Sequence, residues 1–345
     1  MKKIVECVPN FSEGRNQQTI DTIAESIKAV SGVKLMSVEP DKDYNRTVVT
    51  FAGEPEGVLS AAFEATKTAA SLIDMRTHKG EHPRLGAIDV VPFVPITGVT
   101  MVDCIQLARK YGMRVSSELG IPIYLYEYAA TSPERHNLAN IRKGEYEGLA
   151  DKLKDPIWKP DFGNPVFNER SGAIVTGARK FLIAYNVNLN TSDSNLAQEI
   201  ALRIRESGRI VKDEQGKPKR NDKGEPIKIP GTLKAVKAMG VFLERFNIAQ
   251  VSINLTDFDI TPPHISYEEV KKEAKALEIE VTGSEIVGLT PLEALLRAGK
   301  YYAEKLNIRN QLNEKELIAL AIEKLGLSQL DLFDPQKKII EYQLQ

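Results

Sequence analysis

The sequence predicts a mixed α/β protein in which one order of strands and helices occurs twice. Over the first 95 residues, short apolar runs typical of strands alternate with segments of helical periodicity. The same alternation returns after residue 180, although the two halves share little residue identity. A chain of 345 residues is also too long for one ordinary hydrophobic core, which favours two or more domains.

The first half begins with a short strand that ends at Pro9. A helix is expected over residues 19–30, because isoleucines recur there at helical spacing and Gly32 follows where a helix commonly ends. The remaining elements are two strands, an alanine-rich helix and a buried strand, at residues 33–38, 47–52, 55–73 and 88–94. The order strand–helix–strand–strand–helix–strand is that of the ferredoxin-like split βαβ fold.

The second half repeats this order. Strands are expected at 181–189, 235–242 and 250–255, helices at 195–206 and 267–277, and a short apolar segment at 286–289. The two halves are joined by helices at 100–112 and 114–119, a strand at 123–127 and more helix at 133–150. Helices at 291–306 and 314–326 and an edge strand at 339–342 complete the chain.

Two segments between these elements differ in character. Residues 156–172 form a long irregular stretch whose aromatic residues favour an ordered, functional loop. Residues 211–230 are highly charged and nearly devoid of apolar side chains, so we expect them to be mobile.

The composition is that of a globular protein without a strongly charged partner. The net charge is −1, so no overall field attracts nucleic acid or a membrane surface. Two cysteines, Cys7 and Cys104, are too few for a disulfide framework, and we expect both to be small buried side chains. The N-terminus lacks the apolar core of a signal peptide, and no segment is long and apolar enough to span a membrane. We therefore expect a cytoplasmic protein.

The most informative stretch is residues 74–95, which places His78 and His82 on a Gly/Pro-punctuated turn before an apolar strand. Gly80 and Pro83 exclude the helix on which this spacing would bind zinc, and no cysteine lies nearby. The histidines either cap strand ends or perform acid–base chemistry. Imidazole is suited to that chemistry because its pKa is near neutrality. We expect His136 and His264 to be surface residues.

Two further motifs allow both a structural and a functional interpretation. The acidic turn with Glu39, Asp41 and Asp43 is either a solvated hairpin turn or a carboxylate site for a cationic amidinium group. Residues 171–180 are punctuated by glycine and end in two cations. They form either a tight turn or a close approach for a flat heterocycle or a carboxylate. A nucleophile for covalent catalysis is not evident.

Several motifs, in order along nearly the whole chain, resemble those of the formiminotransferase family, the folate-dependent glutamate formimidoyltransferases of histidine degradation and one-carbon metabolism. The matching motifs are VECVPNFSEG from Val5, NRTV from Asn45, HKGEHPR from His78, GAIDV from Gly86, GARKFL from Gly177, AQVS from Ala249 and NL from Asn254.

The resemblance implies two tandem ferredoxin-like α/β subdomains with a folate-binding groove between them. We expect an N-terminal subdomain over 1–179, a C-terminal subdomain over 180–327 and a tail over 328–345, without the cyclodeaminase domain of the vertebrate enzymes. It further implies transfer of a formimino group from N-formimino-L-glutamate to N5 of tetrahydrofolate, the co-substrate. It implies a homodimer, no metal, and no nucleic-acid or membrane partner.

The resemblance also assigns site residues. The catalytic histidine falls on His82, and the acidic residue that acts with it falls on Glu39, where the animal enzymes carry Asp; Asp41 is the alternative. The folate-contacting segments fall on residues 163–172 and 231–240. The expected substrate- and folate-binding residues are Arg46, Arg84, Gly163, Asn164, Phe167, Gly172, Gly177, Arg179, Lys180, Gly231, Thr232, Lys234, Lys237 and Gly240.

Two other functions remain open from the sequence. One is a different folate-dependent one-carbon enzyme on the same scaffold, for example a formyltransferase or a 5-formyltetrahydrofolate cyclase. The other is a non-catalytic folate-binding or assembly protein, which the presence of both the histidine and the acidic residue disfavours.

Overall fold

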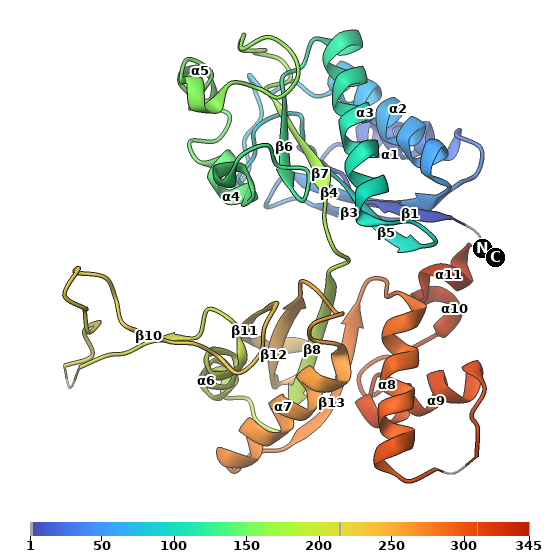
Figure 1. Cartoon of the computed structure of the whole chain (residues 1–345), viewed down its shortest axis with the longest axis vertical. Helices are drawn as coiled ribbons and strands as arrows, with labels where there is room; N and C mark the ends of the chain where they lie inside the picture. The colour runs from blue at the N-terminus through green and yellow to red at the C-terminus, as the bar shows by residue number, and fades with distance from the viewer. Residues whose placement is uncertain (1–2, 214, 309, 345) are drawn as a thin grey trace. The chain divides into compact units, whose positions relative to one another are not determined.

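The computed structural model describes residues 3–213, 215–308 and 310–344. The chain divides into two compact units, Met1–Lys180 and Phe181–Gln343 (Figure 1). Both units contain helices packed on a sheet, so the predicted mixed α/β class is confirmed. No helix among the described residues is long and apolar enough to cross a membrane.

The first unit is built on a seven-stranded sheet. Its strands are β1 (Ile4–Cys7), β2 (Asn10–Phe11), β3 (Val33–Asp41), β4 (Arg46–Gly53), β5 (Ile88–Thr97), β6 (Ile123–Glu127) and β7 (Ile174–Ala178). β1 and β2 both pair with β4 on one side and with β5 on the other, and β3 extends the sheet beyond β4. These pairings are antiparallel, whereas β7 pairs in parallel with β5 and with β6.

Three helices cover one face of this sheet. They are α1 (Gln17–Lys28), α2 (Pro55–Leu72) and α3 (Met101–Leu119), and they lie side by side in Figure 1. Their apolar residues form one core with Val5, Val49 and Phe93 of the strands. Because neighbouring residues of a strand face opposite sides, the residues between these core positions face away from α1–α3.

The opposite face is covered at its β5–β7–β6 side. A smaller core of strand residues packs there against Ile141 and Leu149 of two short helices, α4 (Leu138–Arg142) and α5 (Leu149–Lys152). The prediction of helix over 133–150 is therefore wrong in part. Gly144 and Glu145 have φ values of +90° and +55°, which interrupt a helix between the two short ones. Two 3₁₀ turns, η1 (Pro133–Arg135) and η2 (Pro156–Trp158), flank them.

The glycine-punctuated segment contains a strand that the sequence did not predict. Residues 171–180 were predicted to be a turn or a glycine-lined approach, but Ile174–Ala178 form the buried strand β7. Gly177 fits against β6, because a Cβ atom there would lie 2.4 Å from the carbonyl oxygen of Tyr126. The glycine thus serves close packing between parallel strands.

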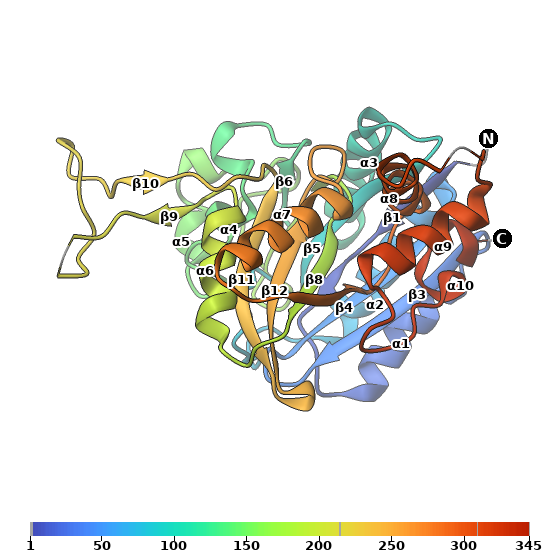
Figure 2. The ribbon, with the colours of Figure 1, turned by 90° about the horizontal axis from the view of Figure 1, so that it is seen from below.

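The second unit has the element order predicted from the sequence. Its sheet contains β8 (Ile183–Leu189), β11 (Val236–Leu243), β12 (Ile248–Leu255) and β13 (Val281–Val287) in the antiparallel order β11–β12–β8–β13. Helices α6 (Ser194–Ile204) and α7 (Pro263–Ala276) connect these strands and lie over them in Figure 2.

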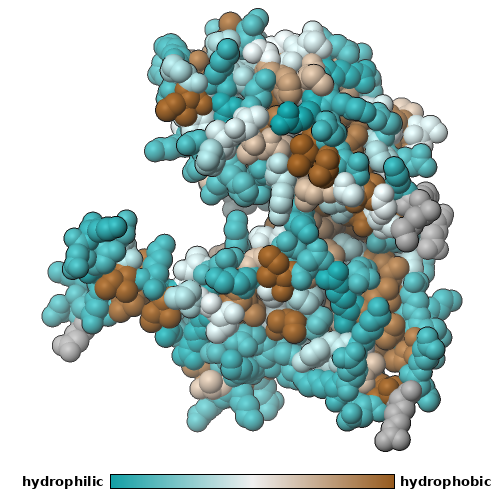
Figure 3. Space-filling model, viewed as in Figure 1, coloured by the Kyte–Doolittle hydropathy of each residue, from teal (hydrophilic) through white to brown (hydrophobic). Residues whose placement is uncertain are grey.

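Residues 211–213 and 215–230 belong to an arm that projects from the second unit. Its base is the two-stranded pair β9 (Arg209–Ile210) and β10 (Lys228–Ile229). Apolar side chains are visible on it in Figure 3, and Ile210, Ile227 and Ile229 are each at least 40% exposed.

The unit ends in helices α8 (Leu292–Lys305), α9 (Glu314–Leu325), α10 (Pro335–Lys338) and α11 (Ile340–Gln343). The edge strand predicted at 339–342 is therefore wrong. The Asp334 side chain caps the turn that Pro335 begins, and only Ile339 makes a single strand-like bridge, with Thr290.

Candidate functional site

The loop between α2 and β5, residues 74–87, lies against the turn between β3 and β4. We call it the histidine loop. Asn45 in that turn connects three segments: its Oδ1 accepts from Gly14 N at 2.9 Å, its Nδ2 donates to the Lys79 carbonyl at 2.9 Å, and its own carbonyl bonds His78. Gly80 packs on the same turn, where a Cβ atom would lie 2.4 Å from Tyr44 O. The loop is thereby fixed to the sheet.

Both ring nitrogens of His78 take part in bonds within this arrangement. Nε2 lies 3.0 Å from the Asn45 carbonyl oxygen, and because a carbonyl only accepts, Nε2 carries the proton. Nδ1 then accepts from Arg84 Nε at 3.4 Å. Burial lowers the pKa of His78, which favours this neutral form. His78 is thus a structural histidine.

His82 differs, because neither of its ring nitrogens has a hydrogen-bond partner among the described residues. Its ring makes an edge contact with Tyr44 at 6.4 Å between ring centres. Burial lowers the pKa of His82 to about 4, and the positive charges of Arg142, Arg46 and Arg84 act in the same direction. At neutral pH the imidazole is uncharged and able to accept a proton.

The predicted cation Arg84 is buried in ion pairs. Its side chain is 6% exposed; Nη1 donates to Glu145 at 2.9 Å, and Nη2 donates to Glu147 at 2.7 Å. A third pair joins Arg142 to the buried carboxylate of Asp89. These bonds attach the histidine loop and the start of β5 to residues 142–147.

Glu39 and Arg46 share the face of the sheet that points away from α1–α3. Val49 of β4 is in the core beneath the helices, so its neighbour Val48 faces the other way. Glu39 of β3 lies opposite Val48 and shares that face, as does Arg46 of β4. Glu39 is exposed, and no hydrogen bond joins it to His82 among the described residues. The alternative carboxylate, Asp41, accepts from the backbone of Asp43 at 3.0 Å and of Tyr44 at 2.9 Å and so stabilises the turn.

Arg46 retains unused hydrogen-bonding capacity. Its Nη1 donates to Asn10 Oδ1 at 3.4 Å, a long bond, and its guanidinium lies 5.9 Å from the Tyr44 ring centre. Its Nε is buried and has no hydrogen-bond partner in the part of the chain that the structure describes. A buried donor without a partner is costly, which is typical of a group that a ligand completes.

Residues 163–172 run from a surface hollow to the histidine loop. Gly163, Asn164 and Phe167 line this hollow of about 520 Å³ beside the end of α3. At the other end, Gly172 forms a bridge with Gly86, and Ser171 O accepts from Ala87 N at 2.9 Å. The structure therefore brings only the last residues of this segment to the histidine loop.

Arg179 and Lys180 follow β7 at the end of the first unit. Arg179 N donates to Phe93 O at 3.2 Å and its Nη1 donates to Lys180 O at 3.0 Å. The positive charge of Arg179 lowers the pKa of Tyr126, against the raising effect of burial, so the guanidinium lies near β6.

The predicted residues of the second unit lie beside the end of α6. Gly231 and Gly240 allow close packing on that helix, where added Cβ atoms would lie 2.0 Å from Arg205 O and 2.2 Å from Gln198 N. Thr232 N donates to Arg203 O at 3.0 Å, Lys234 pairs loosely with Glu206 at 3.9 Å, and Lys237 lines a hollow of about 490 Å³.

The two other histidines differ from each other. His136 is exposed, as predicted, at 65% of its side chain. The prediction for His264 is wrong, because this residue is 6% exposed and stacks on Tyr301 of α8 at 4.7 Å between ring centres. Cys7 and Cys104 are buried free thiols, as expected. The described residues contain no group of three or more His, Cys, Asp or Glu side chains placed to hold a metal ion.

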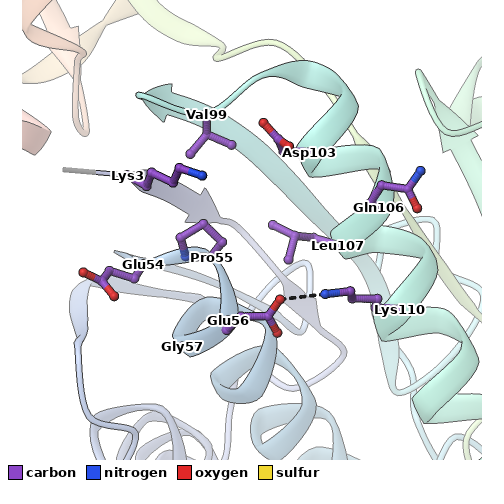
Figure 4. A pocket seen from close by; sticks show the side chains of 10 residues that line it. All are labelled: Lys3, Glu54, Pro55, Glu56, Gly57, Val99, Asp103, Gln106, Leu107 and Lys110. Carbon is purple, nitrogen blue, oxygen red and sulfur yellow. Dashed lines mark hydrogen bonds and ion pairs between the residues drawn. The ribbon is translucent and has the colours of Figure 1, made fainter. Parts of the chain in front are cut away.

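Another hollow, of about 390 Å³, lies between the starts of α2 and α3 (Figure 4). Two of its charged groups, Glu56 and Lys110, pair with each other at 2.6 Å, and Asp103 accepts hydrogen bonds from Thr100 at the start of α3. None of the predicted site residues lines it. The candidate site is therefore the histidine loop with the polar face of β3 and β4.

Sequence reasoning did not single out Asn45, Asp89 or Arg142. Asn45 and Asp89 lie within motifs that carry the family resemblance, which was a usable signal. Arg142 lies 53 residues from Asp89 in the chain and in no such motif, so nothing local indicated its pairing.

Comparisons with known proteins cover nearly the whole chain. Residues 4–179 match the formiminotransferase domain, N-terminal subdomain, and residues 184–345 match the formiminotransferase domain. The chain is 41% identical to glutamate formimidoyltransferase of Streptococcus pyogenes serotype M1, covering 92% of this chain and 100% of the relative. It is 45% identical to the Thermoplasma acidophilum protein of the same name, covering 87% and 92%.

Longer relatives match as well. The chain is 50% identical to formimidoyltransferase-cyclodeaminase of Dictyostelium discoideum over its full length, and it spans 61% of that relative.

Proposed function

The chain belongs to the formiminotransferase family, and from this premise we propose that it transfers the formimino group of N-formimino-L-glutamate to N5 of tetrahydrofolate. The products are 5-formiminotetrahydrofolate and L-glutamate, and the metabolic context is histidine degradation. The names of two relatives that the chain matches over most of their length support this reaction.

We assign the proton transfers to His82. N5 attacks the amidine carbon, and the tetrahedral intermediate then breaks its bond to the glutamate nitrogen. His82 accepts the N5 proton and later donates it to that departing nitrogen, so one imidazole performs both steps in turn. The observation that carries this assignment is that both ring nitrogens of His78 are bonded, whereas those of His82 have no partner among the described residues.

The substrate is held by groups on the polar sheet face. Formiminoglutamate carries two carboxylates and a cationic amidine. Arg46 suits a carboxylate, because its buried Nε lacks a partner in the described structure. The exposed Glu39 lies on the same face and suits the amidinium. Asp41 is less suited, because the backbone of its own turn uses its side chain.

Substrate binding also changes the pKa of His82, the proposed base. With a pKa of about 4, free His82 is a weak base, partly because three arginines act on it. The two carboxylates of the bound substrate outweigh its amidinium charge, offset those positive charges and raise the pKa of His82 towards its ordinary value. The imidazole therefore becomes a stronger base when its substrate is present.

Several further features belong to the proposal. Tetrahydrofolate contacts residues 163–172 of the first unit and 231–240 of the second, and Arg179 and Lys180 attract its anionic tail. The subdomains are 1–179 and 180–327, with a tail over 328–345. The protein acts in the cytoplasm as a homodimer.

The experiment is an assay of tetrahydrofolate-dependent consumption of N-formimino-L-glutamate, followed as formation of 5-formiminotetrahydrofolate. Turnover with this donor supports the proposal. Tight tetrahydrofolate binding without turnover, together with cyclisation of 5-formyltetrahydrofolate or transfer of a formyl group, would replace it with another one-carbon reaction.

A further inference from the structure

The four-stranded sheet of the second unit has one face that carries polar side chains. Gly240 of β11 faces helix α6, because a Cβ atom there would lie 2.2 Å from Gln198 N. Val251 lies opposite Gly240 and Val187 lies opposite Val251, so this row of residues faces the helices (Figure 2). Successive residues of a strand face opposite sides, so the neighbouring rows face away from the helices. These rows contain Met239, Ser252, Asn186 and Glu285, and Val241, Gln250 and Asn188. We call the side that they form the amide face.

A chain of hydrogen bonds joins the side chains of the amide face. Glu285 Oε1 accepts from Asn186 Nδ2 at 3.1 Å and from Gln250 Nε2 at 2.8 Å. Gln250 Nε2 also donates to Asn188 Oδ1 at 2.7 Å, and Asn188 Nδ2 donates to Gln329 Oε1 at 2.6 Å. Gln250 and Asn188 are 1% and 0% exposed. The half-buried Glu285 is therefore oriented by a network that is itself buried.

The carboxylate determines which atoms of this network remain available. A carboxylate only accepts hydrogen bonds, so Asn186 and Gln250 both turn their NH2 groups towards Glu285. Their carbonyl oxygens and Oε2 of Glu285 have no hydrogen-bond partner among the described residues, and Glu285 has no ion-pair partner there. Three acceptor oxygens and one negative charge are thus left for a ligand that donates hydrogen bonds.

We infer that Glu285, oriented by Asn186 and Gln250, is a specificity-determining residue that binds the pterin ring of tetrahydrofolate. The inference rests on the proposed function, which supplies this ligand. The pyrimidine edge of the ring carries two neighbouring donors, the 2-amino group and N3–H. Oε2 of Glu285 and an adjacent amide oxygen can accept hydrogen bonds from them.

The other substrate of the proposed reaction suits this face less well. Formiminoglutamate carries two carboxylates and one amidinium, so its net charge is negative and the unpaired carboxylate of Glu285 repels it. The tetrahydropterin ring is uncharged, and its donors match the free acceptors. The position agrees as well, since Lys237 and Met239 of the proposed folate segment 231–240 lie on the amide face. Met239 is 56% exposed and offers an apolar surface to a flat ring.

The test is binding of tetrahydrofolate to the full chain without a formimino donor, measured by calorimetric titration. In Glu285→Leu the Kd should rise by roughly 10–100-fold, the usual effect of losing a hydrogen bond to a charged group. Glu285→Gln should recover most of the affinity, because its oxygen can face the ring while the neighbouring amide groups reverse. Glu280→Leu is the control, at an exposed residue just before β13, and should leave the Kd unchanged.

A second ligand separates direct contact from structural support. The tetrahydrofolate analogue without the 2-amino group should bind the wild type roughly tenfold less tightly than tetrahydrofolate does. Glu285→Leu should bind both ligands equally, because the group that distinguishes them is gone. If Glu285→Leu weakened both ligands by the same factor, the role of Glu285 would be structural. That result, an unchanged Kd in Glu285→Leu, or a wild type without preference would overturn the inference.

Binding and turnover also separate the inference from the proposed reaction. Turnover of formiminoglutamate together with an unchanged tetrahydrofolate Kd in Glu285→Leu would overturn the inference alone. Binding that depends on Glu285, without turnover, would support the inference and remove the proposed reaction. A wild-type protein that does not bind tetrahydrofolate would overturn both.

Discussion

His78 Nε2 donates to the backbone carbonyl of Asn45, and Asn45 Nδ2 donates in return to the carbonyl of Lys79, at 3.0 and 2.9 Å. This reciprocal bonding ties the histidine loop to the β3–β4 turn. It also distinguishes the two loop histidines, because both ring nitrogens of His78 are bonded, whereas those of His82 have no partner among the described residues, as its proposed role requires.

Asn45→Ala should destabilise the protein by about 3 kcal/mol, because Gly14 N and Lys79 O lose their partners and alanine tolerates the φ of +49° poorly. The control is Asn247→Ala, at an exposed residue with a φ of +51°, which should lose only about 1 kcal/mol. Urea denaturation measures both. Equal losses would mean that the side-chain bonds of Asn45 contribute little.

Gly172→Ala should be more damaging than Gly120→Ala, although the φ values are nearly equal at +67° and +66°. A Cβ atom at residue 172 would lie 2.1 Å from Leu85 O at the histidine loop, whereas at residue 120 nothing lies within 4 Å. We expect the free energy of unfolding to fall by at least about 3 kcal/mol in Gly172→Ala and by about 1 kcal/mol in Gly120→Ala. Thermal unfolding compares them, and similar melting temperatures would contradict the observed packing.

Stability should fall as the pH is lowered from about 6.5 towards 4. Burial lowers the pKa of His264 to about 4, so below its unfolded pKa of about 6.5 the unfolded chain binds a proton that the folded protein does not. At pH 5 this residue alone should have lowered the free energy of unfolding by about 2 kcal/mol. His264→Phe keeps a ring against Tyr301 and should reduce the slope of urea stability against pH.

His136→Gln is the control for this slope, because His136 is exposed and should not contribute. A slope in His264→Phe as steep as in the wild type would show that His264 is not held neutral.

Arg46→Met should raise the KM for formiminoglutamate by roughly 10–100-fold, the usual value of one lost charge-assisted hydrogen bond. The effect on kcat should be smaller, since the carboxylates are bound before and during the reaction. Arg15→Met serves as the control, because Arg15 is exposed and donates to the Lys42 carbonyl. Steady-state kinetics decide, and an unchanged KM in Arg46→Met would remove Arg46 from the substrate site.

The sequence predicted those features that depend on local patterns. The alternation of strands and helices located the histidine loop between α2 and β5 and a turn between β3 and β4, but Glu39 and Asp41 of the predicted acidic turn belong to strand β3. Gly80 and Pro83 correctly excluded a helix around His82. These features follow from backbone preferences of individual residues.

The errors concern contacts between distant residues. β7 was missed because the glycines of residues 171–180 suggested a turn, whereas pairing with β5 and β6, far away in the chain, makes Ile174–Ala178 a strand. His264 was placed on the surface because its neighbours are polar or proline, but stacking on Tyr301 of α8 buries it. Arg142 acquires its place only through Asp89, 53 residues away.

The most direct test of the central claim is turnover of N-formimino-L-glutamate with tetrahydrofolate by the wild type, His82→Gln and His78→Gln. Loss of an acid–base group typically costs 10²–10⁴-fold in rate, so we predict a kcat lowered by that factor in His82→Gln with unchanged unfolding. His78→Gln should instead lose mainly stability. Near-normal turnover in His82→Gln would contradict the account.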